Sequence, residues 1–422
     1  MSSNIFSITG REILDSRGSP TIEVTAVLES GYRGTAAVPS GASKGKYESL
    51  ELRDNDRDRY GGFGVLTAVK NINTTINAAL KGKDALKQDE VDTVMIDLDG
   101  TPNKSTLGSN AILGVSLSVA VAASNHSRVP LYVYLNGMFS KLRPTKMDKI
   151  PTPTFNMING GKHGTGNLDF QEFHVVPASN KSFHEALEMG VEIYYAARSI
   201  LKYRNAVHSI GDEGGFAPNL FTNLDALEVL HESIRNTKYR VGTDVFLGLD
   251  LASSFFFKQT GYQIKDRPAK FTREEFIEYL IDLHKTYRVL ILEDPLEEDD
   301  WVGWKELTAK LGESVLIVGD DLLVTNPERL NKAIEEKACS AILAKPNQIG
   351  TLTEFLSVIA IAKKHDIKVI VSHRSGETTD TFIADLAVAV QSEYVKFGAP
   401  ARGERVVKYN RLLQIEQEMI HK

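Results

Sequence analysis

The sequence contains a single cysteine, Cys339, among 422 residues, so no disulfide can form within the chain. Disulfides persist in oxidising compartments, and a chain without them is consistent with a reducing one. No apolar run of about 18 residues is present to span a membrane. The first residues, MSSNIFSITG, lack the charged and apolar regions of a signal peptide. These absences predict a cytoplasmic protein with no membrane span.

A stripe of basic residues is also missing. The net charge is −6 at pH 7, and lysines and arginines are scattered along the chain, so no nucleic-acid groove is indicated. The composition, 42% hydrophobic and 25% charged, is that of an ordinary globular protein. A chain of 422 residues suggests two or more domains with a large core.

The first third of the chain predicts a small α+β domain. In PTIEVTAVLES, apolar and polar residues alternate as in a half-exposed strand, and Ser30-Gly31 then supplies a hairpin turn. Residues 65–80 carry apolar side chains at helical spacing, and SNAILGVSLSVAVAAS is apolar nearly all round, like a buried helix. The polar stretch GMFSKLRPTKMDK is the expected boundary. We therefore divide the chain into residues 1–136 and 137–422.

After about residue 140, strands alternate with helices. Asn326 and Pro327 form an N-cap and first-turn pair, and residues 351–364 predict a further helix between the strands AILAK and IKVIVSH. The strand ends recur at intervals that suit one βα unit each. This length fits an α/β barrel, (β/α)₈, of about 250 residues or slightly more, with its active site at the carboxyl ends of the strands. A doubly wound sheet stays open as an alternative, because a ladder of βα units does not show closure.

Three apolar runs each end in acid. DVFLGLD ends on Asp250, RVLILEDP ends on Glu293 and Asp294, and SVLIVGDD ends on Asp320 and Asp321. Any one of them fits a turn, since aspartates favour loops. In a barrel, however, strand ends meet at one mouth, so Asp250, Glu293 and Asp320 are expected to share a centre. Clustered carboxylates repel one another unless a cation lies between them, and an all-oxygen set predicts Mg²⁺.

The next strand ends carry positive charge. AILAK ends on Lys345, VIVSHRSGET supplies His373, Arg374 and Ser375, and YVKFGAP supplies Lys396. Either lysine alone fits a solvated or helix-capping charge. The planar fork of arginine beside a hydroxyl suits a phosphate or carboxylate, so HRSGET predicts an anion clamp. Lysines beside each other and beside a metal are expected to have a pKa below the free value of about 10.4, in a range useful for a base.

Two acids and a histidine belong to the same group of candidates. Glu172 lies in the strand-like LDFQEFHVV, and Glu213 precedes two glycines in SIGDEGGFAPN that allow close backbone approach. Glu213 equally fits an ordinary turn. His163 lies in the glycine-rich NGGKHGTGN, where a solvent-facing side chain is the simpler reading. Its spacing from the other candidates does not show whether His163 is catalytic or faces solvent.

Collinear motifs over almost the whole chain resemble those of enolases. They are LDSRGSPTIEV, VPSGAS, LDGTPNKSTLGSNAILGVS, NGGKHG, QEF, GDEGGFAPN, GLDLASS, LEDPLEEDDW, GDDLLVTNP, KPNQIGTLTE, SHRSGET and KFGAPARGER. The resemblance implies an α/β protein with an N-terminal α+β cap domain and an enolase-type barrel that begins ββαα. It implies reversible dehydration of 2-phosphoglycerate to phosphoenolpyruvate in glycolysis and gluconeogenesis, with Mg²⁺. The scheme of a lysine or histidine base with a metal-stabilised enediolate is already known for this superfamily.

The resemblance also implies roles for the matched residues. Lys345 is implied as the base that takes the proton next to the substrate carboxylate, with Lys396 as a further positive charge. Glu213, helped by Glu172, is implied to protonate the departing hydroxyl, a task that needs a carboxyl kept protonated near neutral pH. The remaining implied contacts are a metal held by Asp250, Glu293 and Asp320, a second Mg²⁺ between the phosphate and Ser40, substrate contacts from His163, His373, Gly41 and Ala42, and a phosphate clamp of Arg374 and Ser375.

Four positions depart from the pattern that the resemblance leads us to expect. Lys44 stands where threonine is usual in the loop that closes over substrate, and Phe63 stands where lysine is common. His174 replaces an aliphatic residue or methionine, and Ala344 replaces a branched aliphatic residue. We expect none of these to touch a chemical role, although Lys44 is expected to bear on affinity or closing rate.

Two alternatives stay open. The altered loop SGASKGK would suit a paralogue that acts on another phosphorylated or phosphonate-bearing acid, and a non-catalytic binding protein that retains the fold is the other reading. The resemblance further suggests a homodimer, with a higher oligomer left open. The C-terminal Lys422 leaves room for a surface-binding side role.

Overall fold

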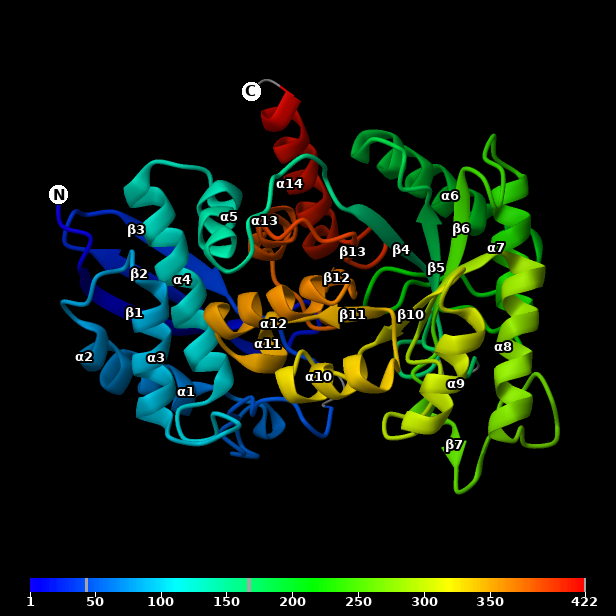
Figure 1. Ribbon diagram of the computed structural model, residues 1–422, viewed down its shortest axis with the longest axis horizontal. Helices are drawn as coiled ribbons and strands as arrows, with labels where there is room; N and C mark the ends of the chain where they lie inside the picture. The colour runs from blue at the N-terminus through cyan, green and yellow to red at the C-terminus, as the bar shows by residue number, and fades with distance from the viewer. Residues whose placement is uncertain (42–44, 165–167, 421–422) are drawn as a thin grey trace.

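A computed structural model describes residues 1–41, 45–164 and 168–420, and its first third forms a three-stranded sheet with helices packed beside it (Figure 1). The strands are β1 (Ile5–Leu14), β2 (Pro20–Leu28) and β3 (Arg33–Ala37), in the antiparallel order β1-β2-β3. Alternate residues of β2 are buried, because successive side chains of a strand point to opposite faces. The predicted hairpin between β2 and β3 is confirmed.

The predicted helix over residues 65–80 forms in three pieces. They are α1 (Leu66–Asn71), a π-helical turn η2 (Ile72–Ile76) and α2 (Asn77–Leu80). The side-chain oxygens of Asn73 and Asn77 accept backbone N–H groups of β1, from Gly10 at 2.7 Å and Ile8 at 2.8 Å. The wider π turn therefore lies where the helix is hydrogen-bonded to the sheet.

The other helices of this part include the predicted buried helix, α4 (Ser109–Ser127), which is buried on nearly all sides. The remaining elements are η1 (Tyr60–Gly62), α3 (Gln88–Asp99) and α5 (Leu131–Leu142). The division predicted between residues 136 and 137 falls inside α5, so as a domain boundary it stays a prediction.

The eight strands of the second part close into a barrel, which excludes the doubly wound alternative. Their order around the ring is β10-β11-β12-β13-β4-β5-β6-β9. Only β5 runs antiparallel to its neighbours, and two helices follow it, so the predicted ββαα start is confirmed. The strands are β4 (Thr152–Asn159), β5 (Glu172–Pro177), β6 (Val245–Asp250), β9 (Val289–Glu293), β10 (Leu316–Gly319), β11 (Ala341–Ala344), β12 (Lys368–Ser372) and β13 (Tyr394–Lys396).

Helices surround the barrel, and Figure 1 shows α6, α7 and α8 at the end of the molecule opposite the β1–β3 sheet. Asn326 caps helix α10 by accepting backbone N–H groups of the first turn, as predicted. Thr351 caps α12 in the same way, at the start of the predicted helix 351–364. The helices are α6 (Phe183–Tyr203), α7 (Asn223–Arg235), α8 (Arg273–Tyr287), α9 (Trp301–Leu311), α10 (Pro327–Glu336), α11 (Pro346–Ile349), α12 (Leu352–Lys364), α13 (Phe382–Ala389) and α14 (Gly403–Ile420). The short η3 (Ser253–Phe255) and the hairpin β7 (Phe257–Lys258) and β8 (Gly261–Tyr262) follow β6.

The interior of the barrel is filled by an apolar cluster. Its members are Val176, Ile291, Val318, Ala341, Leu343 and Ile370, which come from five strands. Cys339 is buried in the larger core that surrounds the barrel. Within the described ranges, no helix combines the length and apolar character needed to cross a membrane.

The sheet-and-helix part contacts the barrel beside the carboxyl ends of the strands. Ser40 and Gly376 exchange two backbone hydrogen bonds, of 2.8 and 2.9 Å, and so join the segment after β3 to the segment after β12. Residues from the first third are thereby brought to the mouth of the barrel.

Candidate active site

A polar pocket lies at the mouth of the barrel. Most of its residues are at or just beyond the carboxyl end of a strand, whereas Glu172 is the first residue of β5. Because β5 runs the other way, its first residue pairs with Asp250, the last residue of β6. The lining residues are Glu48, His163, Gln171, Glu172, Glu213, Asp250, Asp320, Asp321, Lys345, Ser372, His373, Arg374, Ser375 and Lys396.

Lys396 is surrounded by carboxylates. Its Nζ lies 2.9 Å from Asp250 Oδ2, 2.7 Å from Glu293 Oε1 and 3.4 Å from Glu172 Oε2. Burial lowers the pKa of Lys396, but Asp250, Glu172 and Glu293 outweigh burial and raise that pKa well above the ordinary value. Lys396 is therefore positively charged at neutral pH.

Lys345 is held in the same way by one acid. Its Nζ lies 2.5 Å from Asp320 Oδ2, and its side chain is 12% exposed. Burial, Arg374 and Lys396 lower the pKa of Lys345. Asp320 acts in the opposite direction, and the net shift of the pKa is upward. The prediction that these lysines have lowered pKa values is wrong for this structure, because each ammonium group lies against carboxylates.

The three acids predicted as metal ligands do not gather their oxygens at one point. Among the described residues, Asp320 groups instead with Asp294 and Asp321, whose carboxylate oxygens lie within 4.8 Å of one another. Asp294 accepts the backbone N–H groups of Asp320 at 2.9 Å and Asp321 at 2.8 Å. Lys396 lies between Asp250 and Glu293.

The donor set nevertheless fits a cation. Burial and Asp250 raise the pKa of Glu293 well above its usual range, although Lys396 opposes the shift. Burial and Asp320 raise the pKa of Asp321 to about 7. Negative charge in this part of the pocket is therefore not fully compensated by the two lysines, and carboxylate oxygens are the ligands that hard divalent ions prefer.

A second group joins His163 to two glutamates. His163 Nδ1 lies 3.1 Å from Glu172 Oε1 and 3.6 Å from Glu213 Oε1. Burial lowers the pKa of His163, but Glu213 and Glu172 raise it to about 9. Burial and Glu172 raise the pKa of Glu213, but His163 and His373 bring it down to about 2.

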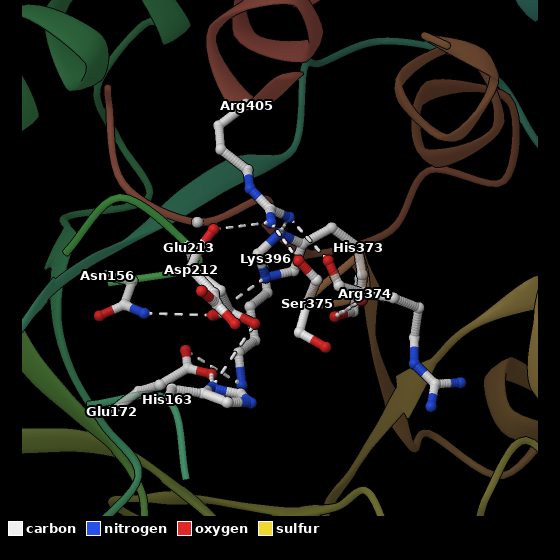
Figure 2. Close-up of polar contacts among 12 residues, drawn as sticks. Asn156, His163, Glu172, Asp212, Glu213, His373, Arg374, Ser375, Lys396 and Arg405 are labelled. Carbon is white, nitrogen blue, oxygen red and sulfur yellow. Dashed lines mark hydrogen bonds and ion pairs between the residues drawn. The ribbon is translucent and has the colours of Figure 1, made fainter. Parts of the chain in front are cut away.

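This arrangement corrects the sequence-based expectation for Glu213. A carboxyl that is protonated near neutral pH was expected there, whereas the neighbouring imidazoles keep Glu213 ionised and the proton resides on His163. Asn156 Nδ2 donates to Glu213 Oε2 at 3.2 Å, a contact that the sequence did not reveal (Figure 2).

His373 is oriented by an arginine that sequence reasoning missed. Figure 2 shows Arg405 reaching from α14 to His373, with Nη1 2.6 Å from His373 Nδ1. On its other side, His373 Nε2 lies 3.5 Å from Glu213 Oε2. Burial lowers the pKa of His373, and Arg405 lowers it further, although Glu213 opposes both. The segment KFGAPARGER contained Arg405, but nothing local linked it to a histidine in another segment.

The predicted anion clamp lies beside the segment after β3. Arg374 Nη1 is 3.1 Å from Glu48 Oε2 and 3.0 Å from Asn347 Oδ1. Arg17, a second missed residue, donates to Ser375 Oγ at 3.4 Å and to Ser40 Oγ at 3.1 Å. Two guanidinium groups therefore approach one end of the pocket.

Ser40 and its neighbours are only partly described. The Ser40 hydroxyl donates to Asp15 Oδ2 at 2.6 Å, and the Gly41 carbonyl accepts from Arg17 at 3.3 Å. Two predicted positions, Ala42 and Lys44, lie outside the described residues, as does Lys422.

One departure from the expected pattern contacts a candidate site residue. His174 Nε2 lies 2.7 Å from Glu172 Oε2, and both side chains are 1% exposed. His174 is therefore a departure that contacts a candidate site residue. Phe63 is exposed, and Ala344 is buried in β11.

Comparisons with known proteins agree over both parts of the chain. The family description "Enolase, N-terminal domain" matches residues 5–135, and "Enolase, C-terminal TIM barrel domain" matches residues 147–422. A curated protein from Beutenbergia cavernae, named enolase, is 50% identical over 415 residues, which cover 98% of this chain and 95% of that protein.

Proposed function

The chain belongs to the enolase family, and on that premise we propose which residues carry out its reaction. The protein is a phosphopyruvate hydratase, a lyase that dehydrates 2-phosphoglycerate to phosphoenolpyruvate in glycolysis. Two proton transfers are needed. A base removes the proton from the carbon next to the carboxylate, and an acid protonates the hydroxyl that leaves from the adjacent carbon as water.

One observation carries the assignment of base and acid. In the closed order of eight strands, β11 and β5 lie four strands apart in either direction. Lys345 follows β11 and Glu172 begins β5, so the lysine and the Glu172–His163–Glu213 group face the pocket from opposite sides. A substrate between them would lose its proton on one side and its hydroxyl on the other.

We assign Lys345 as the base. Burial, Arg374 and Lys396 lower the pKa of Lys345, whereas Asp320 turns the net shift upward. Asp320 is among the acids that we propose as metal ligands, and a cation bound there would offset its charge and favour the neutral amine that a base requires. The α-proton would pass to Lys345 Nζ, and its bonding electrons would move into the enediolate. Lys396, which keeps its charge, would stand beside the negative charge that develops on the substrate carboxylate.

We assign Glu213, helped by Glu172, as the group that delivers a proton to the departing hydroxyl, with His163 supplying that proton. His163 holds a proton at neutral pH and lies within reach of both carboxylates. Proton transfer from His163 through Glu213 would let the hydroxyl leave as water while the carbon–oxygen bond breaks. His373 Nε2 beside Glu213 would complete this side of the pocket.

Family membership implies a divalent metal ion, and the pocket contains acids that could hold one. We propose Mg²⁺, with two ions when substrate is bound. Asp250, Glu293 and Asp320 would hold one, and Ser40 would contact the other. Bound there, the metal would supply positive charge to the enediolate.

We propose that the phosphate binds at the Arg374 end of the pocket. Arg374 and Ser375 would contact its oxygens, and Ser40 and Gly41 would approach the substrate. Support comes from the two guanidinium groups at this end, since arginine pairs well with phosphate.

The direct test follows phosphoenolpyruvate by its ultraviolet absorbance. Purified protein should convert 2-phosphoglycerate when Mg²⁺ is present, stop when a chelator is added and recover when Mg²⁺ is restored. Glu213→Gln should lose dehydration while Lys345 still exchanges the α-proton with solvent deuterium. Loss of exchange in Glu213→Gln, in a folded protein, would contradict the division of roles.

Two further proposals concern the state of the protein in the cell. We propose a homodimer, and we propose that it works in the cytoplasm beside the other enzymes that handle its small phosphorylated substrate. Light scattering after size-exclusion chromatography would give twice the 46.6 kDa of one chain for a dimer. A mass of 46.6 kDa would contradict the first proposal.

A further inference from the structure

His174 occupies a level of the barrel interior just below the pocket. On β5, Glu172, His174 and Val176 alternate with their neighbours and so share one face of the sheet. Val176 belongs to the apolar cluster that fills the barrel, which identifies this face as the inner one. His174 therefore lies between the apolar filling and the acid at the mouth.

The two oxygens of Glu172 have different imidazole partners. Oε2 accepts from His174 Nε2 at 2.7 Å, and Oε1 lies 3.1 Å from His163 Nδ1. A carboxylate only accepts hydrogen bonds, so His174 Nε2 must carry a proton. Lys396 Nζ also lies 3.4 Å from Oε2, which makes the shorter contact with His174 the one that fixes this oxygen.

The adjacent strands provide room for the imidazole and a matching donor. Gly248 is paired with His174 across β5 and β6, and a Cβ at Gly248 would lie only 3.3 Å from His174 Cβ. On the other side, Asn156 of β4 is paired with His174 and donates to Glu213. At this level, β4 and β5 thus supply one donor to each of the two acids above.

We propose that His174 is a positioning residue that locks the carboxylate of Glu172 in the orientation that presents Oε1 to His163. This inference rests on the proposed role of the Glu172–His163–Glu213 group in protonating the departing hydroxyl. Without the donor below it, the Glu172 carboxylate would be free to rotate toward Lys396, and the pair with His163 would weaken. Hydroxyl departure would slow, whereas proton removal by Lys345 on the opposite side of the mouth would continue.

Three variants separate positioning from packing. His174→Met fills a similar volume without a donor, and His174→Gln keeps an N–H near the position of Nε2. Val176→Ala, one step deeper on the same face, leaves a cavity in the apolar filling without touching either acid.

A hydrogen bond to a buried charge supports an expected loss of about 10- to 100-fold in kcat for His174→Met. KM and the rate of α-deuterium exchange should stay within about threefold of wild type. His174→Gln should recover most of the kcat, and Val176→Ala should unfold at lower temperature with kcat unchanged. Equal kcat values for wild type and His174→Met, or parallel losses of kcat and deuterium exchange, would overturn the inference.

A measurement on the wild-type protein keeps the inference testable should His174→Met not fold. In ¹⁵N-histidine NMR spectra of the unliganded protein, whose chain has ten histidines, a protonated, slowly exchanging Nε2 signal should shift in Glu172→Gln. The signal is assigned to His174 by its loss in His174→Gln. A His174 protonated only on Nδ1 would overturn the inference. A wild-type protein that forms no phosphoenolpyruvate would instead overturn the proposed function.

Discussion

Arg405 Nη1 lies 2.6 Å from His373 Nδ1, and this contact decides which nitrogen of the imidazole carries a proton. Guanidinium groups only donate hydrogen bonds, so Nδ1 must accept and the proton of a neutral His373 resides on Nε2. That nitrogen faces Glu213. Arg405 is fully buried and also donates to the carbonyl groups of Arg374 and Ser375, so one side chain of α14 orders the whole segment after β12.

Arg405→Lys should lower both stability and activity. Lysine keeps the charge but cannot reproduce the fork of donors, and buried donors or acceptors without partners are costly. We expect a loss of about 2–4 kcal/mol in the free energy of unfolding, measured by urea denaturation, and a fall in kcat of at least about tenfold.

Arg411→Lys is the matched control, because Arg411 lies on the same helix and pairs with Asp385, away from His373. It should lose some stability and keep kcat. An Arg405→Lys variant with the kcat of wild type would show that the imidazole needs no such partner.

Lys345→Ala should abolish exchange of the substrate α-proton with deuterium as well as dehydration. Among the described residues that line the pocket, Lys345 is the one that follows β11 and carries a nitrogen able to accept a proton. We expect a loss of at least about a thousandfold, in line with the removal of a general base. Proton NMR of the substrate in D₂O measures the exchange directly.

The control for this substitution is Lys363→Ala. Lys363 is also partly buried and pairs with Glu393, but its neighbours lie at the other end of the barrel. Exchange should continue at the wild-type rate in this variant. Deuterium exchange that persists in Lys345→Ala would show that Lys345 is not the base.

Asp320→Asn should weaken the binding of Mg²⁺. The substitution removes a negative charge and one candidate ligand oxygen while it keeps the volume of the side chain. We expect at least about a tenfold loss of affinity, measured by isothermal titration calorimetry with Mg²⁺ alone. Asp299→Asn, at the exposed end of the acidic run 297–299, should leave the affinity unchanged. A loss of affinity in Asp299→Asn but not in Asp320→Asn would show that the metal binds at residues 297–299 instead.

Stability should depend on pH through His163. Its folded-state pKa, about 9, lies above the ordinary value of 6.5, so protonation favours the folded state. This contribution is fully present below pH 6.5 and is lost as the pH rises through 9. A pKa unit corresponds to about 1.4 kcal/mol, so the total is roughly 3 kcal/mol.

Urea denaturation between pH 6 and about pH 10 tests this dependence. The free energy of unfolding should fall across that range in wild type, and the fall should be smaller in His163→Gln. His208→Gln, at an exposed position, should follow the wild-type curve. An unchanged curve in His163→Gln would assign the pH dependence to other groups.

Local patterns in the sequence determined much of the architecture. Alternation predicted β2, helical spacing and caps predicted α10 and α12, and runs of apolar residues predicted strands that end on Asp250, Glu293 and before Asp320. These features depend on neighbours a few residues apart, so the chain itself records them. The resemblance to enolases supplied the order ββαα and the identity of the reaction.

The pairing of the site residues was decided only by the tertiary structure. Arg405 meets His373 from another helix. His174 and Glu172 share a face of β5 by strand alternation, but only the closed barrel turns that face inward to the pocket. The tertiary structure also decided the protonation states of the site residues. The pKa of Lys345 rose and that of Glu213 fell, because a pKa depends on burial and on charges a few ångströms away. Spacing along the chain carries no information about such distances.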